Sequence, residues 1–132
     1  MPLNVGQVSL EFLIVVATFF AFLAIIIPAV LVFMEAAILK LDYYALNANA
    51  DRIEGIANSL CILGDGSSAV VEFDRSVEVR AQGKEITLST KSSGRELIAS
   101  RRVGCEFFPS HIESSKVVIE KKGIVLNIRD SK

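Results

Sequence analysis

The chain has 132 residues and a formal net charge of -1, with 52% hydrophobic and 22% charged residues. This content of apolar residues excludes a disordered chain, and the charge balance argues against a strongly basic nucleic-acid binder. Residues 1–68 carry a net charge of -4 and residues 69–132 a net charge of +3, so the two halves differ in character.

An uncharged apolar segment runs from Phe12 to Met34 and excludes a plain soluble globule. Sixteen of its 23 residues are Leu, Ile, Val or Phe, and about 20 apolar residues suffice for a helix to cross a bilayer. Together these sixteen favour insertion by about 5–10 kcal/mol. A buried core helix rarely runs this long without a polar face, and a cleaved secretory signal would need a basic start and a shorter apolar run. We therefore expect a membrane-spanning helix over residues 12–34.

A short motif precedes this segment. Gly6 and Gln7 are followed by Ser9 and Glu11, in the pattern Gly-Gln-x-Ser-x-Glu that opens directly into the apolar run. In this region the chain resembles the archaeal type IV pilin-like proteins that carry a class III signal peptide. Val15 stands where that family has Leu, and the resemblance covers only about the first 35 residues.

The resemblance implies a processing site and an assembly role. A membrane prepilin peptidase would cut between Gly6 and Gln7, so that residues 1–6 are a leader peptide. Glu11 would then approach the new amine of a neighbouring subunit, because a carboxylate among apolar helices is costly unless it is paired. The bland alternative is that Glu11 only favours the helix dipole, by about 0.3–1 kcal/mol. Pro28 would lie where many such pilins have a helix-kinking proline.

The helical pattern continues beyond the apolar segment, so that residues 7–62 form one long helix. An amphipathic stripe is expected to bury its apolar side on a head domain, and Pro28 to bend or locally unwind the helix unless it is simply tolerated. The stripe has one gap, around Arg52 and Ile53. Its predicted apolar members are Ile38, Leu41, Ala45, Ala48, Ile56 and Leu60.

Residues 69–132 alternate between apolar and polar side chains and predict a β-rich head of four to six short antiparallel strands. Turns are expected at Gln82-Gly83 and at Lys121-Lys122-Gly123, and Leu97 to Ala99 as a short strand of its own. Lys121 and Lys122 suit a solvent-facing turn, and Phe107 and Phe108 suit the core. The predicted fold class is therefore α+β, with a long N-terminal helix packed on a small antiparallel sheet, as in type IV pilins.

Cys61 and Cys105 fit neither a CxxC redox motif nor a zinc cluster. We favour a disulfide that pins the helix end to the sheet, worth about 4 kcal/mol and implying an oxidising location. Two buried free thiols are the alternative. The single histidine, His111, is expected in a loop without a carboxylate partner, which gives no basis for catalysis.

These observations predict a structural subunit of a type IV pilus-like surface filament, major or minor, with its head outside the cell membrane. Its expected partners are the membrane, the prepilin peptidase, the pilus assembly platform and other pilin subunits. No enzyme activity, cofactor, metal site or nucleic-acid partner is predicted. The alternative is a single-span anchored envelope protein whose head binds a partner without polymerising.

Overall fold

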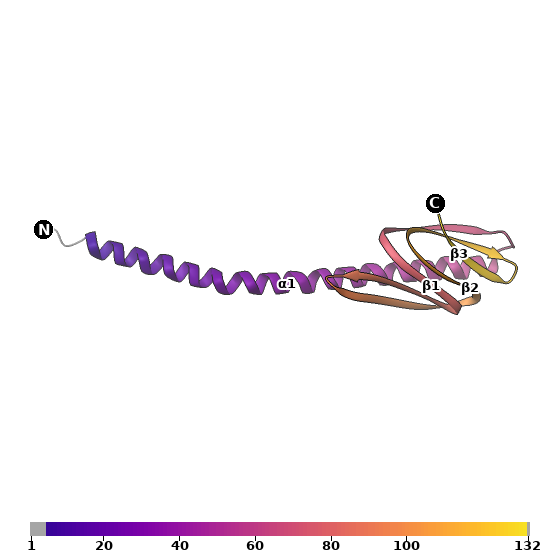
Figure 1. Ribbon diagram of the computed structural model, residues 1–132, viewed down its shortest axis with the longest axis horizontal. Helices are drawn as coiled ribbons and strands as arrows, with labels where there is room; N and C mark the ends of the chain where they lie inside the picture. The colour runs from indigo at the N-terminus through magenta and orange to yellow at the C-terminus, as the bar shows by residue number, and fades with distance from the viewer. Residues whose placement is uncertain (1–4, 132) are drawn as a thin grey trace. The chain divides into compact units, whose positions relative to one another are not determined.

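The computed structural model describes the backbone of residues 5–131 and the side chains of residues 9–131. Over this range it has one helix, α1 (Val5–Ile62), and three strands (Figure 1). The strands are β1 (Ser68–Ser92), β2 (Arg95–Lys122) and β3 (Val125–Asp130). The helix precedes a sheet against which its later part packs, which confirms the predicted α+β class. The chain divides into two compact units, Met1–Ile38 and Leu39–Lys132.

Pro28 lies inside α1, and the residues on both sides of it are helical. The local unwinding that a proline can cause is therefore absent, while a bend at this position stays a prediction. Thr18 is the one residue of the apolar segment with a polar side chain, and its hydroxyl donates to the carbonyl of Val15 at 2.8 Å. This internal bond suits a helix surrounded by lipid, because the hydroxyl needs no outside partner.

One side of α1 packs against the sheet of the second unit. Its contact residues follow a spacing of alternately four and three residues, and each is at most 3% exposed. They form a seam, which consists of Leu46, Ala50, Ile53, Ala57 and Leu60. Small alanines alternate with large residues along the seam, so the strands can approach the helix closely.

The stripe predicted from the sequence was mostly wrong. Only Leu60 belongs to both sets, and Ile56 is partly buried at the edge of the core. Leu41 is 67% exposed, and Ala45 and Ala48 are exposed as well. The predicted stripe had a gap around Arg52 and Ile53. The helix instead places against the sheet a different apolar stripe, which contains Ile53 and has no gap.

β1 and β2 form one long antiparallel hairpin, from the pair Ser68 and Glu120 to the pair Ser92 and Arg95. The two turn residues, Ser93 and Gly94, both have positive φ, as a tight type I′ hairpin turn requires. The last segment of β2, residues 117–122, pairs with β3 in reverse order. Glu106 and Phe107 of β2 also meet β3, at Val125 and Leu126, in parallel order. β3 is thus held by two separate parts of β2.

The predicted number of strands was wrong because two expected breaks do not occur. Gln82 and Gly83 lie within β1, where the register shifts and Gly83 takes a φ of +59°. They therefore lie in a continuous strand, opposite a stretch of β2 that has extra residues, and do not form a turn. Leu97 to Ala99 belong to β2. The predicted turn at Lys121-Lys122-Gly123 is confirmed within one residue, since β2 ends at Lys122 and β3 begins at Val125.

Alternate residues of the three strands face α1 and complete the core. Phe107 is 3% exposed, whereas its neighbour Phe108 is 64% exposed because it points to the other face of the strand. The prediction of a buried phenylalanine pair was therefore right for Phe107 and wrong for Phe108. The core residues of the sheet are Val71, Phe73, Val77, Val79, Ala81, Ile86, Leu88, Ala99, Val103, Phe107, Val117, Ile119, Leu126 and Ile128.

We expect Ile53→Ala to lower the free energy of unfolding of the head by about 2–5 kcal/mol, because it leaves a cavity at a fully buried site of the seam. Ile62→Ala is the matched control, since Ile62 is 88% exposed on the same helix. Urea unfolding of the full chain in detergent measures both. Equal effects of the two variants would contradict the seam as the main contact between α1 and the sheet.

Candidate functional site

The apolar part of α1 is exposed over the residues that the structure describes. Within the described residues, α1 is the one helix that is long and apolar enough to cross a membrane, and none of its most apolar window is buried. Phe12, Phe20 and Phe33 are each more than 60% exposed. Exposure of so many large apolar side chains to water is unfavourable by tens of kcal/mol, so this surface requires lipid or other protein around it.

The predicted processing residues lie at the start of α1. Gly6 and Gln7 are in its first turns, and their side chains fall outside the described set, as do residues 1–4 of the predicted leader. Ser9 and Glu11 follow two and four residues after Gln7, and both are exposed. The exposed carboxylate of Glu11 is therefore accessible to a group from outside.

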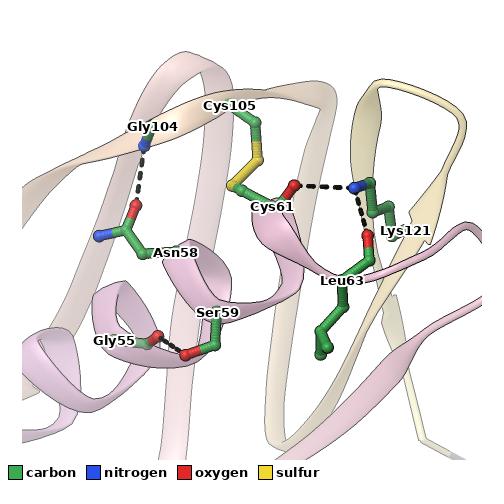
Figure 2. The surroundings of a disulfide bond; sticks show 8 residues. All are labelled: Gly55, Asn58, Ser59, Cys61, Leu63, Gly104, Cys105 and Lys121. Carbon is green, nitrogen blue, oxygen red and sulfur yellow. Dashed lines mark hydrogen bonds between the residues drawn. A yellow bond between two sulfur atoms is a disulfide. The ribbon is translucent and has the colours of Figure 1, made fainter.

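A disulfide joins the two cysteines, as predicted. Cys61 in the last turn of α1 is bonded to Cys105 in β2, with Cα atoms 5.9 Å apart (Figure 2). Three residues before Cys61, the Asn58 side-chain oxygen accepts a hydrogen bond from the Gly104 backbone N–H at 2.8 Å. The end of the helix is thus tied to β2 by one covalent and one polar contact.

Lys121 reaches the same helix end from the other side. Its ammonium donates to the carbonyls of Cys61 at 2.8 Å and Leu63 at 2.5 Å (Figure 2). The last carbonyls of a helix lack partners in the helix and carry partial negative charge, so a lysine there satisfies both needs. The prediction that Lys121 faces solvent was wrong. Asp65 adds a further tie, because its carboxylate accepts a hydrogen bond from the Gly123 N–H at 2.6 Å.

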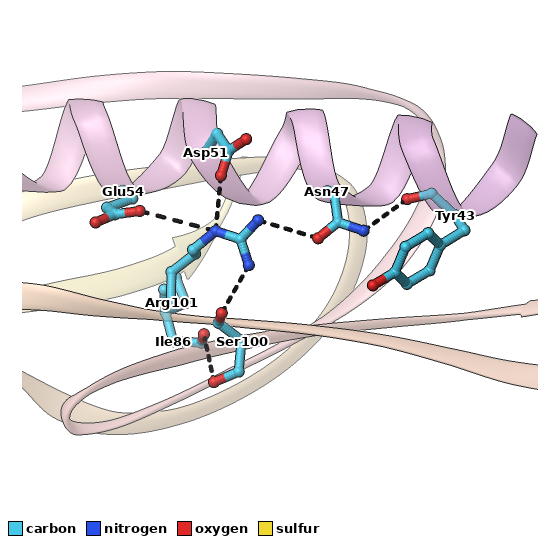
Figure 3. A network of polar contacts seen from close by, with 7 residues as sticks. All are labelled: Tyr43, Asn47, Asp51, Glu54, Ile86, Ser100 and Arg101. Atoms are coloured by element: carbon cyan, nitrogen blue, oxygen red, sulfur yellow. Dashed lines mark hydrogen bonds and ion pairs between the residues drawn. The ribbon is translucent and has the colours of Figure 1, made fainter. Parts of the chain in front are cut away.

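Arg101 links the sheet to the middle of the part of α1 that belongs to the head, residues 39–62. Its guanidinium donates to Asp51 at 2.7 Å and to the Asn47 side chain at 3.0 Å, and Glu54 lies 3.8 Å away (Figure 3). A further bond goes to the backbone carbonyl of Ser100 at 2.8 Å. Arg101 is therefore engaged within the chain, which leaves it little part in binding an anionic partner.

Asp42, near the start of the part of α1 that belongs to the head, is also paired. Ser92, beside the hairpin turn, donates to the Asp42 carboxylate, and Arg75 lies 3.0 Å from the same carboxylate. The hydrogen bond from Ser92, followed by the bond and charge of Arg75, holds the pKa of Asp42 below its usual value of 3.8. The partners of Asp42 are distant in the chain, 50 residues away in the case of Ser92, so no local sequence pattern indicates these contacts.

His111 was expected in a loop without a partner, and both expectations were wrong. It lies in β2, and its Nε2 is 2.5 Å from a carboxylate oxygen of Glu78 in β1. Arg80 at 2.7 Å and Ser89 at 3.1 Å bind the same carboxylate. The bond from Arg80, then those from His111 and Ser89, lower the pKa of Glu78. The cluster joins neighbouring positions of β1 and β2. Ser89 and His111 each form a side-chain hydrogen bond with Glu78.

No group of three or more His, Cys, Asp or Glu residues that could hold a metal ion occurs in the part of the chain that the structure describes. Comparison with known proteins adds no further assignment: no family model, curated protein or solved structure matches this chain. The features of the described chain that bear on function are the exposed apolar helix, the residues at its start and the head that follows.

We expect Lys121→Met to lower the free energy of unfolding by about 1–3 kcal/mol, because two helix-end carbonyls lose a charged donor. Lys122→Met is the matched control, since the exposed Lys122 lies only near Glu120, at 3.9 Å, and should change stability by less than about 0.5 kcal/mol. Urea unfolding without reductant compares them. A control as destabilising as Lys121→Met would refute the helix-end role.

Acid should destabilise the head through Asp42. Because its folded pKa is depressed, its contribution to stability is complete above the ordinary value of 3.8 and is lost as the pH falls through the folded pKa. We expect the unfolding midpoint in urea to fall less steeply below about pH 4 in Asp42→Asn than in the wild type. Asp74→Asn, at an exposed position of β1, is the control. Identical acid profiles of wild type and Asp42→Asn would contradict this assignment.

Proposed function

We propose that this chain is a structural subunit of a type IV pilus-like surface filament. The observation that carries the proposal is the uncovered apolar helix over residues 12–34, with Glu11 exposed at its start and the Gly6-Gln7 motif just before it. A filament core of packed helices would supply the cover that this surface lacks. The head has a core of its own, so it is able to stay folded when the apolar segment leaves the membrane.

The proposed life of the chain begins in the membrane. A prepilin peptidase would cut after Gly6 and create an amine on Gln7. In the assembled filament that amine would approach Glu11 of a neighbouring subunit, because each charge is costly among apolar helices unless it is paired. An assembly platform would deliver each subunit, and the helices would exchange lipid contacts for contacts with one another. The Cys61–Cys105 disulfide fits a head exposed to an oxidising space outside the membrane.

The alternative is a single-span anchored protein whose head binds an envelope partner. A self-contained head behind one apolar helix is all that such a protein needs, and this favours the alternative as a second candidate. It differs from the filament subunit in one chemical respect, because an anchor has no use for cleavage between Gly6 and Gln7.

The intact mass of the protein from native membranes, with and without reduction, separates the two. A filament subunit should begin at Gln7 and be two hydrogens lighter before reduction. A chain that still contains Met1 would favour the anchored protein. The same mass shift on reduction is expected for both, so it tests the disulfide independently of the processing.

We expect Glu11→Ala to insert into the membrane as the wild type does and to assemble poorly, because insertion depends on residues 12–34 and assembly on the paired carboxylate. Glu35→Ala is the matched control, since Glu35 is an exposed carboxylate just after the apolar segment. Membrane fractionation and the yield of sheared filaments measure the two steps. Wild-type filament yield from Glu11→Ala would refute the pairing role.

A further inference from the structure

The sheet has a hollow beside β3, on the face turned away from its core. Four residues line it, Phe108, Lys122, Val125 and Asn127, and we call it the Phe108 hollow. Its volume is about 280 Å³. Sites for drug-sized ligands have volumes of about 300–1,000 Å³, so the Phe108 hollow suits a group of the size of one ring. All four residues belong to the head.

The strand register explains the shape of the hollow. Lys122 of β2 pairs with Val125 on one edge of β3, and Phe108 directly follows the part of β2 that pairs with the other edge. Side chains alternate between the two faces of a strand, and the core residues next to Phe108, Val125 and Asn127 take the inner face. Lys122 and Phe108 therefore stand on either side of β3, two strand spacings or about 10 Å apart, with the shorter side chains between them.

The two sides of the hollow differ in chemistry. The Phe108 ring is 64% exposed and forms a flat apolar wall. On the opposite side, the Lys122 ammonium lies 3.9 Å from Glu120, which is beyond hydrogen-bond distance, so this ion pair uses none of its donors. The Asn127 amide lies between the walls and can both donate and accept. A ligand here meets an apolar wall on one side and hydrogen-bonding groups on the other.

The charges around the hollow cancel. Lys122 and Arg129 are positive and lie 3.9 and 3.8 Å from the carboxylate of Glu120. Glu106, which pairs with Val125 across the strands, is exposed and adds a second negative charge. A charged ligand therefore finds no surplus of the opposite charge, which disfavours phosphates, nucleic acids and acidic sugars. Hydroxyl groups suit the balanced surroundings, because each of them donates one hydrogen bond and accepts others.

The backbone of β3 is already paired beside the hollow. Val125 and Leu126 have partners in β2 on both edges of the strand. A peptide therefore cannot add to the sheet here as a further strand, which is the usual way in which a sheet binds an extended peptide. Recognition of a ligand falls to the side chains of the hollow.

We propose that the Phe108 hollow binds a neutral sugar ring, one pyranose unit of a glycan. A pyranose has an apolar C–H face, which packs on the ring of Phe108, and hydroxyl groups, which bond with the Asn127 amide and the Lys122 ammonium. A single ring on an open surface binds weakly, with a Kd of about 1 mM. This inference goes beyond the proposed function and holds for a filament subunit and for an anchored protein alike.

Saturation-transfer NMR detects such weak binding. The full chain is kept in a detergent without a sugar headgroup, and micelles without protein are the blank. The probes are the methyl glycosides of glucose, mannose and galactose, whose blocked anomeric carbon imitates a unit within a chain. Methyl glucuronide is the matched charged probe, because it has the ring of the glucoside with a carboxylate added. We expect saturation transfer to at least one neutral glycoside, and weaker transfer to the glucuronide than to the glucoside.

Phe108→Ala tests the apolar wall. Because Phe108 is exposed, the urea unfolding midpoint should stay that of the wild type, while the affinity for the sugar should fall by about tenfold or more. Ile98→Ala is the matched control, since Ile98 is also a large apolar residue of β2 and is 55% exposed. Phe108→Tyr keeps an aromatic wall and should keep the affinity. Lys122→Met is a second variant of the hollow and should weaken binding without loss of stability.

The outcomes are distinct. Binding of a neutral glycoside that Phe108→Ala weakens and Ile98→Ala leaves unchanged supports the proposal. No binding of any of the three neutral glycosides would overturn it, as would affinity that stays unchanged in both Phe108→Ala and Lys122→Met. Stronger binding of the glucuronide than of the glucoside would overturn the neutral class of ligand. The assay needs no filament, so its failure leaves the proposed function standing.

Discussion

One continuous helix must satisfy two different surroundings, and the rest of the structure follows from this constraint. Over residues 12–34 the helix is apolar on every side, as contact with lipid or with other helices requires. Over residues 46–60 it presents a narrow seam, and the sheet covers that side alone. The head is a separate unit because the seam and the sheet together form a core that contains no residue of the apolar segment.

Polar contacts fix how the sheet sits on the seam. Apolar packing alone tolerates small shifts, whereas Arg101 on Asp51 and Asn47, Lys121 on the last helix carbonyls, and Asn58 on Gly104 each specify one position along the helix. The disulfide lies beside the last two of these contacts. Register is therefore set most firmly at the end of the helix that is remote from the apolar segment.

Sequence reasoning predicted the features that depend on long, uniform patterns. The apolar segment, the long helix and the β-rich head are of this kind, because composition and period indicate them locally. The disulfide joins residues that are 44 apart, and it could be predicted because the chain has two cysteines and therefore one possible pairing. Sequence reasoning failed where the choice depends on contacts distant in the chain. The stripe through Leu41 and the seam through Ile53 are both apolar at helical spacing, and only the sheet decides between them. His111 and Lys121 were misplaced for the same reason, since their partners, Glu78 and Cys61, lie 33 and 60 residues away.

The position of the disulfide has a mechanical consequence. When the head is held and the apolar part of α1 is pulled, the load passes from the helix to the sheet through the seam. The helix would tend to slide out lengthwise, because apolar side chains resist such slip only weakly. Cys61 is bonded to Cys105 at the end of the seam that is remote from the pulled segment. The apolar contacts from Leu46 to Leu60 therefore lie between the pulled segment and the covalent bond, and they share the load with it. The covalent bond would therefore keep the helix and the sheet of the head together under such a load.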